Sequence, residues 1–248
     1  MNYMNLSLAW MGALNMALAL YGCTNGIETG LSAPEGIPVT VLAEISPVTK
    51  SGEAVSSDNG FDRTSFLSGD QIKVTRTKKA SGTAASQSAS YRYDGTSAWT
   101  VVGTSPVTLE PAVTYSAQFP ADYSAINQFQ TTSAAYLASN LLKTGDATSS
   151  DGTLDFTSSG KPFTHVNSKL TLKFTVNRET TIANDAVLVA AAGIRTAVST
   201  NQTITLYRPY PVDASRKYEW CGILRAVGGS AGTPATDLTV SLTCDGVT

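Results

Sequence analysis

The chain has 248 residues, a formal net charge of −2 and only 15% charged residues, and these values already exclude several classes of protein. With 17 Lys and Arg against 19 Asp and Glu and no basic block, the sequence does not indicate nucleic-acid binding. A single long apolar stretch excludes a polytopic membrane protein, and 42% hydrophobic residues argue against a disordered chain. The 60 Ser and Thr residues, with 20 Gly, favour strands and turns over helices.

The N-terminal segment 1–22 is an apolar run without a charged side chain, and it ends at a cysteine. Leu20, Gly22 and Cys23 stand at positions that resemble a bacterial lipobox, and polar residues follow directly. We therefore predict a lipoprotein signal peptide over 1–22, with Cys23 as the lipidated new N-terminus. The alternative is an ordinary signal or membrane anchor with an incidental cysteine. The lack of a basic residue before the run is compatible with a natural start upstream of Met1.

Short runs of alternating apolar and polar residues predict strands from Val39 onward, because a period of two buries one face of a strand. The Asp94-Gly95 pair between two of these runs predicts a hairpin turn. The clearest run is 170–176. The apolar positions of the expected strands are Val39, Val41 and Ala43; Ile72 and Val74; Tyr91 and Tyr93; Trp99 and Val101; Val113, Tyr115, Ala117 and Phe119; Leu170, Leu172, Phe174 and Val176; Ile204 and Leu206; and Leu238, Val240 and Leu242.

One segment has helical spacing instead. Its apolar residues recur at three- and four-residue intervals after Thr132-Ser133, and Gly145 follows them. This pattern predicts a short amphipathic helix of about ten residues that must pack on a sheet, because so short a helix is marginal alone. The apolar positions are Ala134, Leu137, Ala138, Leu141 and Leu142.

Short strands at regular spacing with turn residues between them predict an all-β fold built from β-sandwiches. We place a domain boundary near Ser158, which gives an N-terminal sandwich over 23–158 and a C-terminal sandwich over 159–248. The second sandwich is expected to be incomplete at its C-terminal end, because residues 245–248 resemble a turn that enters a further strand.

Motifs for catalysis or metal binding are missing from the sequence. His165 is the single histidine, and no Gly-x-Ser-x-Gly elbow, phosphate-binding loop or Cys/His cluster accompanies it. We therefore predict no enzyme, no metal and no cofactor. Cys221 and Cys244 could form a disulfide in an exported protein or pack as free thiols, and the sequence leaves both open. Core packing is the expected role of three aromatic residues on strand faces: Trp99, Tyr115 and Trp220.

An ordered set of short segments resembles the fimbrillin-like subunits of type V pili from Gram-negative anaerobes. The resemblance covers about 180 residues and thins after Val176. The segments are Cys23 in the lipobox, Thr49-Lys50, 66–74 (FLSGDQIKV), 91–93 (YRY) with Trp99, 115–120 (YSAQFP), 141–142, 154–156 (LDF) and 163–174 (FTHVNSKLTLKF).

The resemblance implies two transthyretin-like, Greek-key β-sandwich domains without catalytic activity. It also implies an exported lipoprotein precursor of the outer membrane that becomes a shaft, tip or anchor subunit of a fimbrium, assembled by strand exchange and supporting adhesion. The implied partners are other pilus subunits, the outer membrane through the lipid anchor, and a host surface protein or glycan.

In this sequence the removable strand would be 39–45, freed by a trypsin-like protease that cuts after Lys50 or Arg63. Alternatively, these two residues only solvate a loop, and an anchor subunit would keep its lipid and remain uncut. The competing hypothesis is an outer-membrane surface lipoprotein that binds glycans. Such a protein would need two or three coplanar exposed aromatic side chains.

Overall fold

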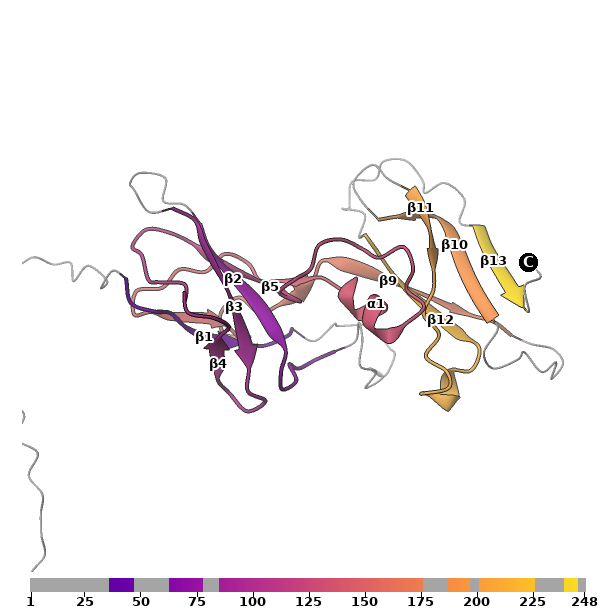
Figure 1. Ribbon diagram of the computed structural model, residues 1–248, viewed down its shortest axis with the longest axis horizontal. Helices are drawn as coiled ribbons and strands as arrows, with labels where there is room; N and C mark the ends of the chain where they lie inside the picture. Colours follow the sequence, from indigo (N-terminus) through magenta and orange to yellow (C-terminus); the bar gives the residue numbers. More distant parts are fainter. Residues whose placement is uncertain are drawn as a thin grey trace, which may run out of the picture. The chain divides into compact units, whose positions relative to one another are not determined.

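The computed structural model describes residues 36–46, 63–77, 85–175, 187–196, 201–225 and 239–244 (Figure 1). All of them fall within one compact unit, Ala33–Thr248. Nearly every regular element is a strand, which confirms the predicted all-β fold. The helical elements of the described residues are α1 (Ser133–Ala138) and a 3₁₀ turn at Ala214–Arg216, and neither is long and apolar enough to cross a membrane.

The larger sheet has six strands in the order β4-β3-β2-β5-β6-β8, and all neighbours are antiparallel. Alternation along β2 places Ile72 and Val74 in the core, both fully buried, and leaves Lys73 exposed between them. The predicted hairpin at Asp94-Gly95 is confirmed, because it joins β3 to β4. The strands are β2 (Gln71–Arg76), β3 (Gln87–Tyr93), β4 (Trp99–Val101), β5 (Tyr115–Phe119), β6 (Leu142–Lys143) and β8 (Thr164–His165).

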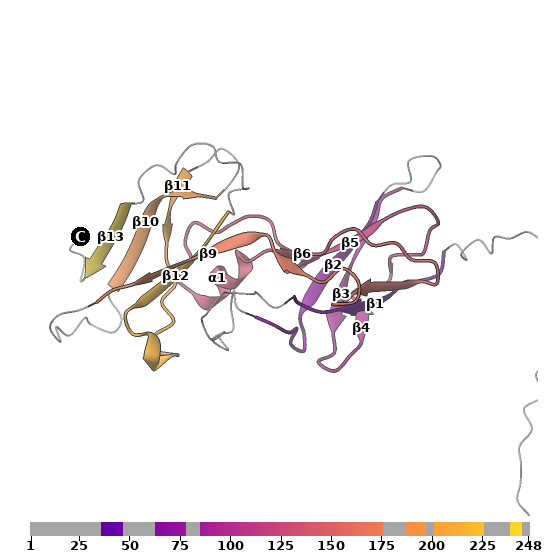
Figure 2. The same cartoon turned by 180° about the vertical axis from the view of Figure 1, so that it is seen from behind.

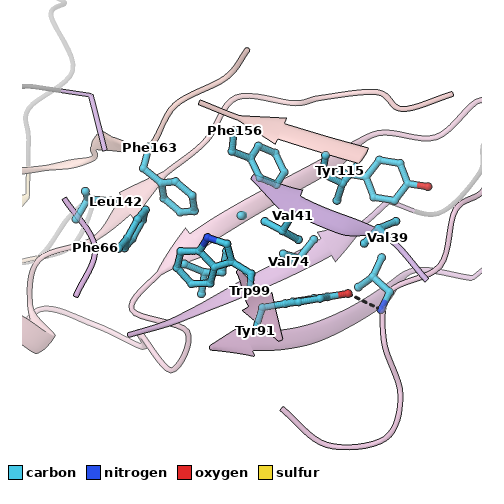
Figure 3. Close-up of a cluster of buried hydrophobic side chains, with 14 of the residues drawn as sticks. Val39, Val41, Phe66, Val74, Tyr91, Trp99, Tyr115, Leu142, Phe156 and Phe163 are labelled. Atoms are coloured by element: carbon cyan, nitrogen blue, oxygen red, sulfur yellow. Dashed lines mark hydrogen bonds between the residues drawn. The ribbon is translucent and has the colours of Figure 1, made fainter. Parts of the chain in front are cut away.

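A parallel pair of strands, β1 (Thr40–Ala43) and β7 (Thr153–Phe156), forms the second layer over this sheet. The first core lies between the two layers and contains Val41, Phe156 and Tyr115 (Figure 3). The ring of Phe66 lies in the same core, in edge contact with several aromatic rings. Its centroid is 4.9 Å from that of Trp99, 5.4 Å from that of Phe119 and 5.3 Å from that of Phe163.

A second core lies between two smaller sheets (Figure 2). One sheet has the order β11-β10-β13, from Asn201–Thr205, Val187–Arg195 and Thr239–Cys244, and the other pairs β9 (Asn167–Lys173) with β12 (Glu219–Arg225). The chain passes from the first core to the second between Phe163 and Leu170, because these residues pack in different cores. The domain limits at 158 and 159 stay a prediction.

Helix α1 begins as predicted but ends too early for the sequence pattern. The Thr132 hydroxyl caps it by accepting a hydrogen bond from the Ala135 amide at 3.2 Å. The expected continuation through Leu141 and Leu142 is wrong, because the helix ends at Ala138 and Leu142 pairs with Phe119 in the six-stranded sheet. Leu142 is 1% exposed in the first core, and the free energy gained by this burial outweighs the local preference for a helix.

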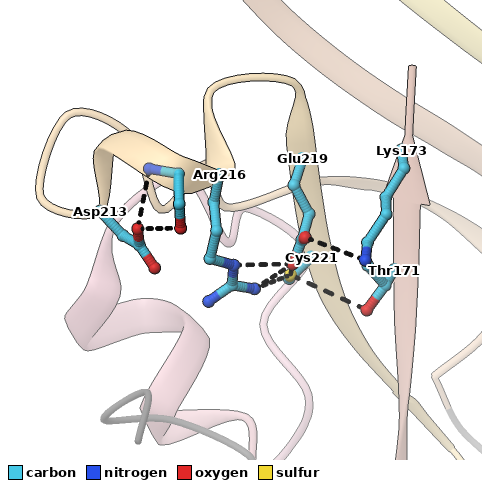
Figure 4. Close-up of polar contacts among 7 residues, drawn as sticks. Thr171, Lys173, Asp213, Arg216, Glu219 and Cys221 are labelled. Atoms are coloured by element: carbon cyan, nitrogen blue, oxygen red, sulfur yellow. Dashed lines mark hydrogen bonds and ion pairs between the residues drawn. The ribbon is translucent and has the colours of Figure 1, made fainter. Parts of the chain in front are cut away.

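A buried polar cluster stabilises the turn before β12 (Figure 4). Arg216 donates from Nε to Glu219 Oε1 at 2.8 Å and from Nη2 to Cys221 Sγ at 3.1 Å. Burial alone would raise the pKa of Glu219, but the hydrogen bond and the charge of Arg216 outweigh it and lower that pKa. Burial raises the pKa of the Cys221 thiol. Of the two alternatives for Cys221, the structure has the free, packed thiol.

Candidate functional site: strand β1 and its groove

The segment 36–46, which contains β1, has one buried and one exposed face. Val39, Val41 and Ile45 are 6%, 2% and 3% exposed, whereas Leu42 on the opposite face is 42% exposed. The local sequence explains this arrangement, because alternate residues of a strand point to opposite sides. One face of the segment is therefore part of the first core, as the sequence predicted for 39–45.

Both edges of this segment are hydrogen-bonded to the rest of the chain. On one edge it runs parallel to β7, and Val41 lies opposite Leu154. On the other edge it pairs with the segment 107–109, which the sequence analysis did not single out. The backbone bonds are Thr40 N to Gly152 O (2.8 Å), Glu44 N to Phe156 O (3.0 Å), Ser46 N to Phe163 O (2.8 Å), Phe163 N to Glu44 O (3.0 Å), Gly36 N to Leu109 O (3.0 Å), Val39 N to Val107 O (3.0 Å) and Leu109 N to Ile37 O (2.7 Å).

The groove that holds β1, here called the β1 groove, has apolar walls on both sides. Its wall residues have no exposed surface while β1 is in place. Without the segment 36–46 they would be uncovered, and the carbonyl and amide groups on both edges would lose their partners. A second strand with the same alternation would cover the apolar wall residues and would hydrogen-bond to the backbone groups of both edges. The wall residues are Val107, Leu109, Leu154, Phe156 and Phe163.

A polar loop after β7 adds a contact to the exposed Glu44, the residue that follows β1. The Ser158 amide donates to Glu44 Oε2 at 3.0 Å. Asp155 shapes the loop, because the Thr157 hydroxyl and amide donate to Asp155 Oδ1 at 2.6 Å and 2.9 Å. These bonds lower the pKa of Asp155. Gly160 is required at the end of the loop, because a Cβ there would lie 2.3 Å from the Asp155 carbonyl oxygen.

Of the predicted site residues, the structure describes Arg63 but not Cys23 or Lys50, which lie outside the described residues. Arg63 donates from Nη2 to Asp70 Oδ2 at 2.6 Å, and its guanidinium lies 5.3 Å from the ring centroid of Phe119. The Arg63 side chain is only 15% exposed. Lipidation and processing stay predictions.

No family model matches the chain, and no curated protein sequence is similar to it. Three solved structures from Bacteroides are similar in fold. A "putative cell adhesion protein" from Bacteroides uniformis is 14% identical with a TM-score of 0.49, and the match covers 84% of this chain and 80% of that one. A "fimbrial protein" from Bacteroides ovatus is 16% identical with a TM-score of 0.44, over 88% of this chain and 45% of that one. A "putative cell adhesion protein" from Bacteroides fragilis is 15% identical with a TM-score of 0.40, over 85% and 84%.

The identities and TM-scores are too low to transfer a function from any of the three proteins. The functional conclusion therefore depends on the contacts of β1 and on the resemblance in the sequence.

The aromatic side chains of the described residues are mostly buried, as expected for core packing. Trp99, Tyr115 and Trp220 are 9%, 0% and 1% exposed. Within the described ranges, Phe129 is the one aromatic side chain that is mostly exposed, at 68%. The described residues thus offer no set of coplanar exposed rings for stacking on sugars.

Proposed function

We propose that this chain is a structural, non-enzymatic subunit of a cell-surface pilus that assembles by β-strand exchange and supports adhesion. The observation that carries the proposal is the double role of the segment 36–46. It packs one face into the first core, and it is hydrogen-bonded to β7 on one edge and, through residues 36–39, to 107–109 on the other. A strand held in this way by one chain can be replaced by a strand of another chain. The fimbrillin-like pattern of the sequence supports the same function.

In the proposed pathway the exported precursor is held at the outer membrane by a lipid on Cys23, with β1 in its own groove. A trypsin-like protease cuts after Lys50 or Arg63, both of which lie between β1 and β2 in the sequence. The freed β1 leaves, and the β1 groove then accepts a strand from the next subunit. A subunit that remains uncut would serve as the anchor.

Strand β13 is the best candidate for the donated strand. In the described residues it pairs only with β10, so it occupies an edge of its sheet. Val240 and Leu242 lie opposite the buried Ala191 and Val189 and thus share their face, yet they are 38% and 37% exposed. An alternating edge strand with a poorly covered apolar face can leave its sheet at a lower cost than a central strand.

A disulfide that locks β1 in place tests strand exchange. Thr40 and Thr153 are register partners in the parallel pair of β1 and β7. Neighbouring strands lie about 4.8 Å apart, which is within the Cα–Cα range of a disulfide. In the T40C/T153C variant we expect normal proteolytic processing but no polymer under oxidising conditions, because the cut strand stays attached. Polymer formation is measured by electron microscopy and by size-exclusion chromatography.

Reduction of the same sample is the matched control and should restore assembly to the wild-type level. The buried Cys221 thiol, with its raised pKa, is not expected to compete for the new cysteines. Polymers formed by the oxidised, locked chain would show that the β1 groove is not the site of exchange.

Removal of both candidate processing residues tests the cleavage step. We expect the K50Q/R63Q variant to remain at full precursor length and to form no polymer, because β1 stays covalently joined to β2. The measurement is the mass of the protein extracted from the cell surface, with wild-type chain from the same strain as control. Unaltered polymer from this variant would contradict the assignment of the processing sites.

The alternative function, a surface lipoprotein that binds glycans, has less support because the described aromatic side chains are mostly buried. A glycan array with the purified chain distinguishes the two functions.

A further inference from the structure

Arg63 is held in the folded chain by contacts on two sides of its guanidinium. Asp70 binds it at 2.6 Å, and the Phe119 ring lies beneath it at 5.3 Å from the centroid. The same Asp70 oxygen also accepts a hydrogen bond from the Leu67 amide at 2.6 Å. One carboxylate thus ties the Arg63 side chain to the turn that precedes β2.

The backbone that follows Arg63 is anchored as well. Phe66, three residues further along, is only 8% exposed and packs against the rings of Trp99 and Phe163. A trypsin-like protease must withdraw the basic side chain into a pocket that carries its own carboxylate. It must also hold an extended backbone on both sides of the bond that it cuts. The Arg63 side chain and the backbone on the Thr64 side of this bond are not available to the protease while these contacts persist.

We infer that the Arg63–Thr64 bond is a closed processing site in the folded precursor and that the Asp70 carboxylate keeps it closed. The inference rests on the processing step proposed above and selects between its two candidate residues. A protease that acts on the folded chain cuts after Lys50, and Arg63 becomes a substrate only after its contacts open.

The first core links this opening to β1. Phe163 is hydrogen-bonded through its backbone to Glu44 and Ser46 in the β1 segment, and its ring contacts that of Phe66 at 5.3 Å. Departure of β1 therefore removes support from the residues that anchor the Arg63–Thr64 bond. Cleavage at Arg63 follows the loss of β1 and does not precede it.

Limited proteolysis of the full chain with trypsin tests the closed site, with fragments identified by mass spectrometry. We expect cleavage after Arg63 to be slow in the wild-type chain and at least about tenfold faster in D70N, because cleavage follows the population of the open form. Asn keeps the size of Asp and an acceptor for the Leu67 amide. The matched control is D122N, since Asp122 lines the same hollow of about 620 Å³ and its loss should leave the rate unchanged.

Cleavage after Arg92, within β3, serves as an internal measure of global unfolding. A selective rise at Arg63 in D70N supports the inference, whereas equal rates in wild type and D70N, or an equal rise at Arg92, overturn it. If D70N does not fold, F119L takes its place with the same expected rise and the same contradicting result. The assay involves no pilus assembly, so a failed disulfide-lock experiment and a failed proteolysis experiment are distinguishable.

Discussion

Replacement of Val41 by Asp is expected to lower the free energy of unfolding of the first sandwich by about 3–5 kcal/mol. Val41 is 2% exposed in the middle of β1 and faces the core between the two layers. The described residues that cluster with Val41 in the first core are hydrophobic, so a carboxylate there would lose its hydration, and its protonated form would still be a buried polar group. The alternation of the strand gives it no route to solvent.

Leu42→Asp is the matched control, because Leu42 is the next residue on the same strand but is 42% exposed. It should change stability by less than about 0.5 kcal/mol. Urea unfolding measures the free energy of unfolding of both variants. If strand exchange is correct, the V41D precursor should also form oligomers without processing, because its β1 leaves the groove more readily. Equal unfolding midpoints for the two variants would contradict the assigned face of β1.

The sequence was informative where a strand buries only one face. Val41 in β1 and Val74 in β2 alternate with exposed residues, so their strands were predicted at nearly the right positions. Strand β12 shows no period of two, because it is buried on both faces, and only Trp220 was placed on a strand face there from the sequence. Its Gly222 leaves room for Leu206, whose side chain would lie 2.4 Å from an added Cβ. Such a close approach has no signature in one sequence.

The candidate site could be predicted only in part, because a single sequence shows local patterns but not contacts between distant segments. The alternation of 39–45 identified the strand that fills the groove, because that pattern is local. The groove itself combines Val107, Leu154 and Phe163, which are distant in the sequence and meet only in the folded chain. The partner of Arg63 is likewise a tertiary contact, although Asp70 lies just seven residues away. The direction of the Asp70 side chain depends on the turn before β2, which the sequence pattern does not specify.

Replacement of Gln130 by Met is expected to cost about 3–5 kcal/mol, because Gln130 acts as a substitute for a neighbouring strand of β12. Its side chain is fully buried. Its Oε1 accepts from the Ile223 amide at 2.7 Å, and its Nε2 donates to the Ile223 carbonyl at 2.9 Å. Met has nearly the same length but no polar atoms that could replace these bonds, so both backbone groups of Ile223 would be buried without partners.

Gln128→Met is the matched control, since Gln128 is an exposed residue on the same segment and should tolerate the change. Urea unfolding gives the stability of both variants, and hydrogen exchange of the Ile223 amide reports the bond itself. We expect that amide to exchange faster in Q130M even under native conditions. A stable Q130M chain with an unchanged Ile223 amide would show that packing, and not hydrogen bonding, is what Gln130 contributes to β12.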